Sequence, residues 1–519
     1  MEEKTTNRTE RAFNGTLVSF LQYGLQMLLQ AFLAPLVLCL AGQETLGAYA
    51  LLIQVYAYIA MLDLGFSATL TRFLANARGY QDEGRRFRDV ISTARTFLLG
   101  SNTCIAILTF LLSYQIDTFF TMTPAVAAQA RLGLVILALW TVLKTPWSVY
   151  GIGLNATQNL AAYNFAGIIG NVSRLIFSLI LVYGGAGLVG LMLANVLADA
   201  GSAIFATRYF SRLHPQLKPA WGLPNKGLFR EMMVFSLQAL LINIAWRLVY
   251  YTDNIVIGYL YGAAAVSIYY TTQIPTTIGF NIANRVSDNA APAINELFAR
   301  GEEAKLRTVF LKLHRYNFLL VMPLVAGLLV LNQDLITLWV GAAQYAGDQM
   351  TYALAGFALL ITTSHVSGVF VIASGKIRLF SYIAILEGLV NLGLSLFLGR
   401  IIGIPGVIIA TVIANIPTTA YLLVVTMRRF KVSAQEYLNS CILPLLLPIG
   451  AGYVANIFMS RWMDGVSWAS FLLQGSGLVI VYGIFVFRLG LDKTERSWLE
   501  EKLLYLLRKR RKVELEQAG

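Results

Sequence analysis

The sequence predicts an all-α membrane protein that crosses the bilayer many times, and composition and hydropathy carry that prediction. Of the 519 residues, 57% are hydrophobic and only 13% are charged, whereas a soluble domain carries about 25% charged residues. The mean hydropathy is +0.64. The chain repeats apolar runs of about 20 residues, the length a helix needs to cross a bilayer. This composition excludes an ordinary soluble enzyme and a disordered chain, which needs high charge.

Fourteen apolar runs are expected to form transmembrane helices. The first is too long for the apolar segment of a signal peptide, so it is expected to be retained. No connection between the runs is long enough to fold as a domain. The expected helices cover residues 15–40, 46–70, 96–116, 131–153, 162–183, 188–209, 233–260, 263–290, 314–333, 349–373, 379–400, 404–427, 437–458 and 467–487.

The basic residues predict which helix ends face the cytoplasm. Both termini and every second connection together hold 33 of the 40 Lys and Arg residues, and the opposite connections hold three. Because Lys and Arg concentrate in cytoplasmic loops, both termini are expected in the cytoplasm, which agrees with an even number of helices. This bias explains the net charge of +13 without a nucleic-acid partner.

The two halves of the chain correspond at a constant offset of 220 residues. The matches keep helices one, two, five and six in register with helices seven, eight, eleven and twelve. Six helices per repeat is an even number, so the halves have the same orientation, related by an axis along the membrane normal. The matching pairs are Gly42 and Gly262, Tyr49 and Tyr269, Arg95 and Arg315, Asn171 and Asn391, Asn195 and Asn415, Arg208 and Arg428, and Phe210 and Phe430.

The repeat predicts two six-helix lobes and two extra C-terminal helices, a plan typical of transporters with a central cavity. The tail alternates apolar and basic residues and is expected to lie as a helix on the inner leaflet. The expected segments are a cytoplasmic N-terminus (1–14), an N-lobe (15–210), a cytoplasmic linker (211–232), a C-lobe (233–430), helices thirteen and fourteen (431–487) and a basic cytoplasmic tail (488–519).

Four basic residues lie inside expected helices, where a charge costs about 2.5–3.5 kcal/mol at mid-membrane. Lys144, Arg174, Arg247 and Arg285 each share a helical face with polar side chains. They either pair with internal acids or line a hydrated cavity that binds an anion; the Arg guanidinium suits phosphate. We take them as candidate anion-binding residues. The side chains expected to line the same cavity include Gln26, Gln30, Asn171, Asn243, Asn281 and Asn391.

Four acidic residues are candidates for ion coupling or gating: Asp63, Asp199, Asp253 and Glu387. They are also alternative partners for the bases, as is Asp288, and Asp63 has the alternative role of capping a helix end. His365 stands alone in its helix and is interpreted as a hydrogen-bonding residue rather than a proton relay. No phosphate loop, metal-ligand spacing or nucleophile motif is present, so no enzyme, catalytic residue, metal or cofactor is expected.

Several short motifs follow one another over roughly residues 12–430. They are GAYALL from Gly47, LDLGF from Leu62, TRFLA from Thr71, YTDNIVIGYLYG from Tyr251, VSIYY from Val266, PAINELFARG from Pro292 and LWVG from Leu338. This series resembles the bacterial polysaccharide transporters. They are the lipid-linked oligosaccharide flippases, including those for O-antigen, of the superfamily that also contains the MATE drug exporters.

The resemblance implies a substrate and a direction of transport. The substrate would be a polyprenyl-pyrophosphate-linked oligosaccharide, moved from the inner to the outer leaflet of the bacterial cytoplasmic membrane for lipopolysaccharide or exopolysaccharide synthesis. A cationic cavity would take the pyrophosphate, and the lobes would alternate between inward-open and outward-open states. The implied partners are the lipid-linked substrate, membrane lipids, and the polymerase and glycosyltransferases of the same pathway.

Two other function classes remain as alternatives. A MATE-type multidrug antiporter often places an acid in the first helix, but this helix carries Gln22, Gln26 and Gln30 and no acid. Bases in the cavity would also repel cationic drugs. A membrane-bound polysaccharide polymerase or ligase carries a large outer loop with catalytic Arg or His, and no long basic outer loop is expected here.

Overall fold

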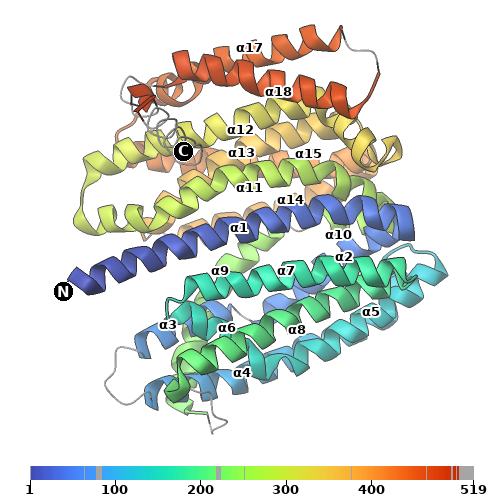
Figure 1. Ribbon diagram of the computed structural model, residues 1–519, viewed down its shortest axis with the longest axis vertical. Helices are drawn as coiled ribbons and strands as arrows, with labels where there is room; N and C mark the ends of the chain where they lie inside the picture. The colour runs from blue at the N-terminus through green and yellow to red at the C-terminus, as the bar shows by residue number, and fades with distance from the viewer. Residues whose placement is uncertain are drawn as a thin grey trace, which may run out of the picture. The chain divides into compact units, whose positions relative to one another are not determined.

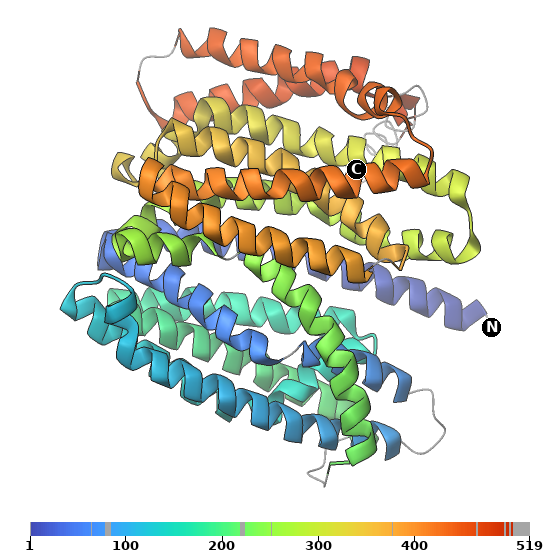
Figure 2. The same cartoon turned by 180° about the vertical axis from the view of Figure 1, so that it is seen from behind.

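The computed structural model describes residues 2–63, 65–77, 85–217, 224–250, 252–375, 377–462, 465–491, 495–497 and 500–501. All regular secondary structure in these ranges is helical (Figures 1 and 2). The α-helices up to residue 261 are α1 (Glu2–Ala41), α2 (Gln43–Ile59), α3 (Phe66–Ala77), α4 (Arg85–Phe119), α5 (Pro124–Leu143), α6 (Thr145–Ala156), α7 (Leu160–Tyr183), α8 (Gly187–Leu213), α9 (Lys226–Tyr250) and α10 (Asp253–Tyr261).

The remaining helices continue the pattern of long apolar segments. Two short π-helical stretches, Leu438–Ile442 and Val486–Gly490, adjoin the last two long helices. The α-helices are α11 (Ala263–Arg300), α12 (Glu303–Val340), α13 (Asp348–Ala373), α14 (Ile377–Ile402), α15 (Ile404–Arg429), α16 (Ala434–Tyr437), α17 (Leu443–Ser460) and α18 (Trp468–Phe485).

Twelve helical segments among the described residues are long and apolar enough to cross a membrane. The chain is therefore an all-α, multi-pass membrane protein with 12 candidate spans. The helices at the expected spans 233–260 and 263–290 are not among the twelve. In α11 the reason is visible in the sequence, because its second half carries Arg285 and Asp288 among several asparagines.

Three of the helices expected to be continuous are broken, which corrects the sequence prediction. The expected helix 46–70 ends as a 3-10 turn, Ala60–Asp63, before α3. Gly65 adopts a positive φ of 68°, and Asp63 Oδ1 accepts a hydrogen bond from the amide of Phe66 at 2.8 Å. Asp63 therefore caps α3, as a short acceptor side chain does at a helix N-terminus.

The other two breaks lie at Lys144 and between α9 and α10. The expected helix 131–153 divides into α5 and α6 at Lys144, and Pro146, which has no amide hydrogen, stands in the first turn of α6. The expected helix 233–260 divides into α9 and α10, with residue 251 outside the described residues. The expected interfacial tail helix lies almost entirely outside them as well, from residue 502 onward.

The described contacts divide the chain into two compact units. Unit 1 comprises Met1–Ile274, Ala343–Ala346 and Ser381–Ala414, and unit 2 comprises Pro275–Ala342, Gly347–Phe380 and Asn415–Gly519. This division cuts through α11, α14 and α15, whereas the expected lobes keep each of these helices whole. The two units are described separately.

In unit 1, α7 packs along α1 and α8, and α5 lies on the other side of α8 (Figure 1). Small residues allow the close approach of α7 and α8: a Cβ on Gly201 would lie 3.3 Å from Ser173 Oγ. A separate aromatic cluster joins α3 and α4, where the rings of Phe66 and Phe97 stack at 4.0 Å.

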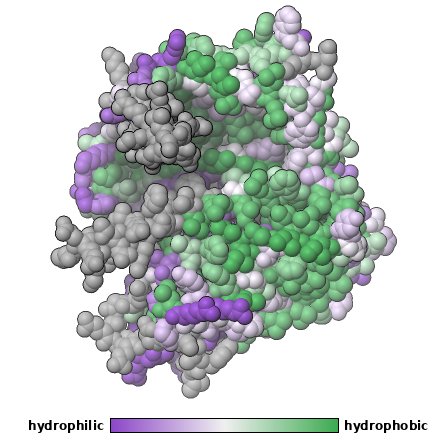
Figure 3. Space-filling view, in the orientation of Figure 1, coloured by the Kyte–Doolittle hydropathy of each residue, from purple (hydrophilic) through white to green (hydrophobic). Residues whose placement is uncertain are grey.

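In unit 2, α17 and α18 pack against each other and against α12 (Figure 1). The core contains an aromatic group in which Phe310 contacts Phe370, Phe430 and Tyr437. Outward-facing side chains such as Leu472 and Val479 are more than half exposed. Green apolar atoms cover much of the described surface in Figure 3, as expected of helices that face lipid.

Residues 220 positions apart adopt matching local structure. Gly42, between α1 and α2, has φ 84° and ψ 168°, and Gly262, between α10 and α11, has φ 82° and ψ 176°. Tyr150 and Phe210 pack edge to face at 5.9 Å, and their counterparts Phe370 and Phe430 do so at 5.6 Å. The offset found in the sequence therefore has counterparts in the backbone and in the cores.

Candidate functional site

Lys144 has an acidic partner within unit 1. Its Nζ lies 3.0 Å from Oδ2 of Asp199 on α8, and the Trp140 indole donates to the same oxygen at 2.8 Å. The side chains are 31% and 47% exposed, and Asp63 lies within electrostatic range of Lys144. Of the two alternatives for this base, the structure thus shows the ion pair.

Arg174 is different, because no acidic side chain of the described residues lies within 4.0 Å of it. It stands half-buried on α7, one turn after the buried Asn171. Its Nε is buried and has no hydrogen-bond partner among the described residues. A buried donor without a partner is costly, so this guanidinium is available to a ligand that supplies an acceptor.

A tyrosine of another helix lies near this base, and a second tyrosine lies near the first. Tyr270 of α11 lies within electrostatic range of both Arg174 and Tyr49 of α2. The Tyr49 hydroxyl accepts a hydrogen bond at 3.1 Å from Nδ2 of Asn195 on α8. Hydroxyls and amides near a cation are the groups that bind sugar and phosphate oxygens, so this part of unit 1 is the candidate anion site.

Asp253, the first residue of α10, is 6% exposed. The Tyr269 hydroxyl donates to its Oδ2 at 2.5 Å, and Oγ1 of Thr411 lies 3.0 Å from its Oδ1. Thr411 Oγ1 is also 3.0 Å from Oδ1 of Asn391, which accepts from Ser395 at 3.1 Å. Four helices, α10, α11, α14 and α15, contribute to this cluster of oxygen atoms.

The charge of Asp253 is not balanced by a base, since no Lys, Arg or His of the described residues lies within 4.0 Å of its carboxylate. A buried carboxylate without a cation is unfavourable. Oxygen ligands of this kind suit a proton or a hard cation. The carboxylate of Asp253 can therefore hold a small cation. The other two acids have different contacts: Asp63 caps α3, and Asp199 pairs with Lys144.

Arg285 has an acidic neighbour in unit 2. Its Nη1 lies 3.6 Å from Oδ2 of Asp288, one turn later on α11, and Oδ1 of Asp288 lies 2.8 Å from Nε2 of His365 on α13. His365, which stands alone in the sequence of its helix, is thus a hydrogen-bonding residue whose partner is an acid.

The remaining candidate residues lie on α1, α9, α11 and α14. Asn243 and Arg247 belong to α9, but their side chains lie outside the described residues. Glu387 is buried on α14, one turn before Asn391. Gln26 is exposed and Gln30 half-buried on α1, and Asn281 is half-buried on α11.

Three contacting residues were missed by sequence reasoning: Trp140, Tyr269 and Thr411. Thr411 also lies 3.2 Å from the carbonyl oxygen of Val407, four residues before it. Threonine in a membrane helix commonly bonds its own helix in this way, so its type carries no signal. The only available signal was that Tyr269 pairs with Tyr49 in the repeat.

The backbones of α2 and α11 meet at Gly47. A Cβ at this position would lie 1.7 Å from the carbonyl oxygen of Ala263. The amide of Ala263 donates to Thr121 O at 3.1 Å, and Gln43 Nε2 donates to Ala264 O at 3.0 Å. Only glycine permits this approach of two helix backbones.

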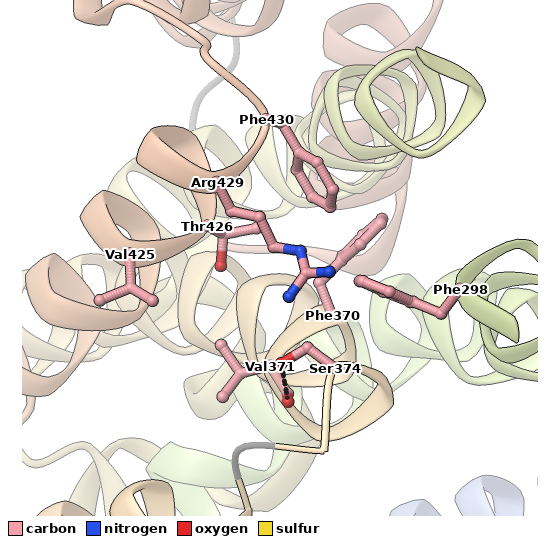
Figure 4. A pocket seen from close by; sticks show the side chains of 8 residues that line it. All are labelled: Phe298, Phe370, Val371, Ser374, Val425, Thr426, Arg429 and Phe430. Carbon is pink, nitrogen blue, oxygen red and sulfur yellow. Dashed lines mark hydrogen bonds between the residues drawn. The ribbon is translucent and has the colours of Figure 1, made fainter. Parts of the chain in front are cut away.

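Unit 2 has a small pocket whose lining contains none of the candidate residues. It has a volume of about 20 Å³, room for about one water molecule. Arg429 extends over the ring of Phe298 at 4.8 Å (Figure 4). It also pairs with Glu303 at 3.0 Å. The lining of the pocket consists of Phe298, Phe370, Val371, Ser374, Val425, Thr426, Arg429 and Phe430.

Comparison with known proteins adds a family and a fold. A family model described as polysaccharide biosynthesis protein matches residues 39–347, more than half of the chain. No curated protein matches the sequence. The chain is similar to the lipid II flippase MurJ in an inward closed conformation, with 16% identity and a TM-score of 0.66, covering 91% of this chain and 97% of that chain.

Two further similar structures are multidrug resistance MATE family transporters. The inward-facing one has 15% identity and a TM-score of 0.66, covering 78% of this chain and 94% of that chain. The outward-facing one has 16% identity and a TM-score of 0.61, covering 82% of this chain and 96% of that chain. At these identities the likeness shows the fold alone, which is that of MATE transporters and MurJ.

Proposed function

This chain belongs to the polysaccharide biosynthesis protein family, and from that premise we propose that it is a lipid-linked oligosaccharide flippase. Its substrate is a polyprenyl-pyrophosphate-linked oligosaccharide, which it moves from the inner to the outer leaflet of the bacterial cytoplasmic membrane for surface polysaccharide synthesis. The transporter fold supports a non-enzymatic role. The pathway is that of an O-antigen, another lipopolysaccharide component or an exopolysaccharide, with its polymerase and glycosyltransferases as partners.

The observation that carries this proposal is the state of Arg174. Its guanidinium has no acidic partner and a buried, unbonded Nε among the described residues. A guanidinium binds a phosphate through two parallel hydrogen bonds. The hydroxyl of Tyr270, which lies within electrostatic range of Arg174, and that of Tyr49 beside Tyr270 would accompany the pyrophosphate or the first sugar. Arg247 and Arg285 are proposed as further anion contacts along the path, whereas Lys144 is held in its ion pair with Asp199.

We propose fourteen spans in two lobes of six, with the last two helices outside the repeat. The seventh span is α9 with α10, and the eighth is α11. The equal backbone angles at Gly42 and Gly262 support this register, because each glycine separates the first and second span of its repeat. Both termini are then cytoplasmic, as the distribution of Lys and Arg favours.

With this topology, the contact of Gly47 with Ala263 lies at the outer ends of the first two spans of each repeat. Close backbone packing there holds these ends together. The transport cycle by alternating access would require this contact to open, so that the substrate can leave toward the outer leaflet. Interfaces between packed helices have discrete arrangements rather than a continuous range.

Asp253 is the proposed ion-coupling residue. Its carboxylate is buried among hydroxyl and amide oxygens and has no basic partner among the described residues. Protonation or binding of a cation such as Na⁺ would neutralise it. Glu387, buried on the helix that also carries Asn391, is proposed as a gating residue of the same region.

The direct test is a leaflet assay with the purified full chain in liposomes. They contain a labelled polyprenyl-pyrophosphate oligosaccharide, and its accessibility to an enzyme added outside is followed with time. Protein-dependent exchange that is lost in Arg174→Gln supports the flippase. Arg131→Gln is the matched control, because Arg131 pairs with Asp117 at an exposed position. Normal exchange by Arg174→Gln would contradict the role of this base.

A MATE-type drug antiporter is the second candidate, favoured by the fold likeness to multidrug MATE transporters. It predicts gradient-driven efflux of a soluble organic cation and no exchange of the lipid-linked substrate. The same liposomes distinguish the two functions when they are loaded with a fluorescent organic cation in place of the lipid.

A further inference from the structure

The Asp288 carboxylate stands between two basic side chains of unit 2. Its Oδ1 lies 2.8 Å from Nε2 of His365, and its Oδ2 lies 3.6 Å from Nη1 of Arg285. The first distance is that of a hydrogen bond, and the second is that of a loose ion pair. The carboxylate of Asp288 therefore contacts a histidine, a residue type that changes charge near neutral pH, and an arginine, a residue type that stays charged.

These three side chains are partly exposed. The exposed fractions are 18% for His365, 36% for Asp288 and 33% for Arg285. Charged side chains within membrane helices face the bundle interior or water rather than lipid. A proton can therefore reach the carboxylate, and an anion can reach the guanidinium.

Ionisable groups on the neighbouring helices have other contacts. The charged side chains acting on Asp288 are His365 and Arg285. On α12, which packs against α13, His314 contacts Ser367 and Arg315 contacts Glu495. On α15, which reaches α13 through Thr419 and Leu360, Arg428 is exposed and Arg429 pairs with Glu303.

We propose that Asp288 and His365 form a proton-binding site that controls the availability of Arg285 and so couples proton uptake to anion binding. This rests on the proposed function, because the anion is the pyrophosphate of the flippase substrate. With neutral His365 the charges of the three side chains sum to zero. One added proton raises the sum to +1 and favours an anion at Arg285. By thermodynamic reciprocity, the bound anion draws a proton into the site.

The chain then has two kinds of arginine. Among the described residues no carboxylate contacts Arg174, so protonation of an acid does not control its contact with an anion. Arg285 is ready only when its carboxylate neighbour is occupied by a proton or by a protonated His365. An arginine of the second kind can release its anion when the proton leaves, which is what a transport cycle requires at one of its ends.

The test measures binding of a short-prenyl diphospho-disaccharide to the full chain in nanodiscs. Both phosphates of this probe are esters, so its charge is constant between about pH 5 and 8. The wild-type affinity is expected to fall with rising pH, by up to about tenfold per pH unit for one coupled proton. Asp288→Asn should bind tightly across this range, because Arg285 is released. His365→Gln should bind weakly throughout, because the carboxylate keeps its charge.

Asp117→Asn is the control, since it removes a carboxylate from another arginine pair; it should keep the wild-type slope. A wild-type slope in both Asp288→Asn and His365→Gln would overturn the proton site. Absence of binding by the wild type at every pH would contradict the proposed function instead. NMR of labelled histidine, of which the chain has three, then measures the chemical shift of His365 as a function of pH. A His365 titration that Asp288→Asn leaves unchanged would overturn the proton site.

Discussion

The two repeats place different chemistry at equivalent positions. In the C-terminal repeat, Asp253, Asn391 and Thr411 form an oxygen cluster. At the positions 220 residues earlier, the N-terminal repeat keeps only the asparagine, Asn171, and has Leu33 and Leu191 in place of the other two. A carboxylate site is thus present in one repeat and replaced by apolar side chains in the other.

Two of the four in-helix bases show the opposite distribution. Arg174 and Lys144 of the N-terminal repeat correspond to Leu394 and Ser364, which carry no charge. Asp199 corresponds to Thr419, and Trp140 corresponds to Leu360. The two residues are in contact in both repeats: Trp140 donates to Asp199 at 2.8 Å, and Thr419 Oγ1 lies 3.5 Å from the carbonyl oxygen of Leu360. One helical framework therefore carries an arginine without an acidic partner among the described residues, Arg174, where the other repeat has a leucine, and a buried carboxylate, Asp253, where the first repeat has a leucine.

The largest effect is expected where the repeats themselves make contact. Gly47→Val places side-chain atoms where the carbonyl oxygen of Ala263 lies, so α2 and α11 cannot close. We expect flipping to fall by at least about tenfold, because one state of the cycle is lost. The leaflet assay measures the rate, and labelling of a cysteine introduced at Gln43 measures accessibility.

Gly327→Val is the control, because its Cβ would meet no atom within 4 Å. It is expected to leave the accessibility of position 43 unchanged. Wild-type flipping by Gly47→Val would show that this close approach is not needed for transport.

A second large effect is expected at the C-terminal oxygen cluster. Asp253→Asn keeps the shape of the side chain and removes its charge. The equivalent residue of the N-terminal repeat, Leu33, is also uncharged. We expect a loss of at least about tenfold in transport driven by an H⁺ or Na⁺ gradient, while exchange without a gradient persists. Imposing each gradient separately on the liposomes identifies the ion. If wild type and Asp253→Asn respond equally to the H⁺ gradient and equally to the Na⁺ gradient, Asp253 has no part in coupling.

A stability effect is expected at another equivalent pair, Arg95 and Arg315. Arg95 donates to Pro146 O at 3.1 Å and lies over the ring of Tyr150, whereas Arg315 pairs with Glu495, beyond the repeat. Removing one partner of a fully buried ion pair costs about 3–5 kcal/mol, and a smaller loss is expected here because the two side chains are 15% and 11% exposed. Arg315→Gln should therefore lower the melting temperature measured in detergent, and Glu495→Gln should lower it similarly. A melting temperature unchanged in both would show that this ion pair does not stabilise the fold.

The smallest effect is expected at the ion pair of Lys144. Because Lys144 and Asp199 are partly exposed, their pairing contributes about 0–1 kcal/mol. The double variant Lys144→Gln with Asp199→Asn should retain flipping within about threefold of the wild type. Each single variant should do worse than the double, because it leaves one charge without its partner. A double variant that loses all flipping would mean that Lys144 contacts the substrate.

The helices could be predicted from the sequence more fully than the site. Apolar runs of membrane-spanning length determine where α7, α13 and α18 begin and end to within a few residues. The break at Lys144 was missed, because Pro146 is also compatible with a kinked continuous helix. The side of each helix that carries polar residues was readable, since it depends only on spacing within the helix.

The partners of the polar residues could not be predicted, because they depend on which helices pack together. Nothing in the sequence distinguishes Lys144, which meets an acid on α8, from Arg174, which meets none among the described residues. The expected hydrogen bond of His365 is present, whereas its exclusion from proton binding is untested and is replaced by the proposal above. Its partner Asp288 is 77 positions away, so spacing carried no signal for the pair.

Arg174, which has no acidic partner among the described residues, is the base that we propose to bind the pyrophosphate. The most direct measurement is the affinity of the full chain in nanodiscs for a short-prenyl diphospho-disaccharide, compared among the wild type, Arg174→Gln and Lys144→Gln. We expect Arg174→Gln to weaken binding by at least about tenfold, the loss of a charge-assisted contact, and Lys144→Gln to weaken it by less than about threefold. A larger loss in Lys144→Gln than in Arg174→Gln would contradict the account.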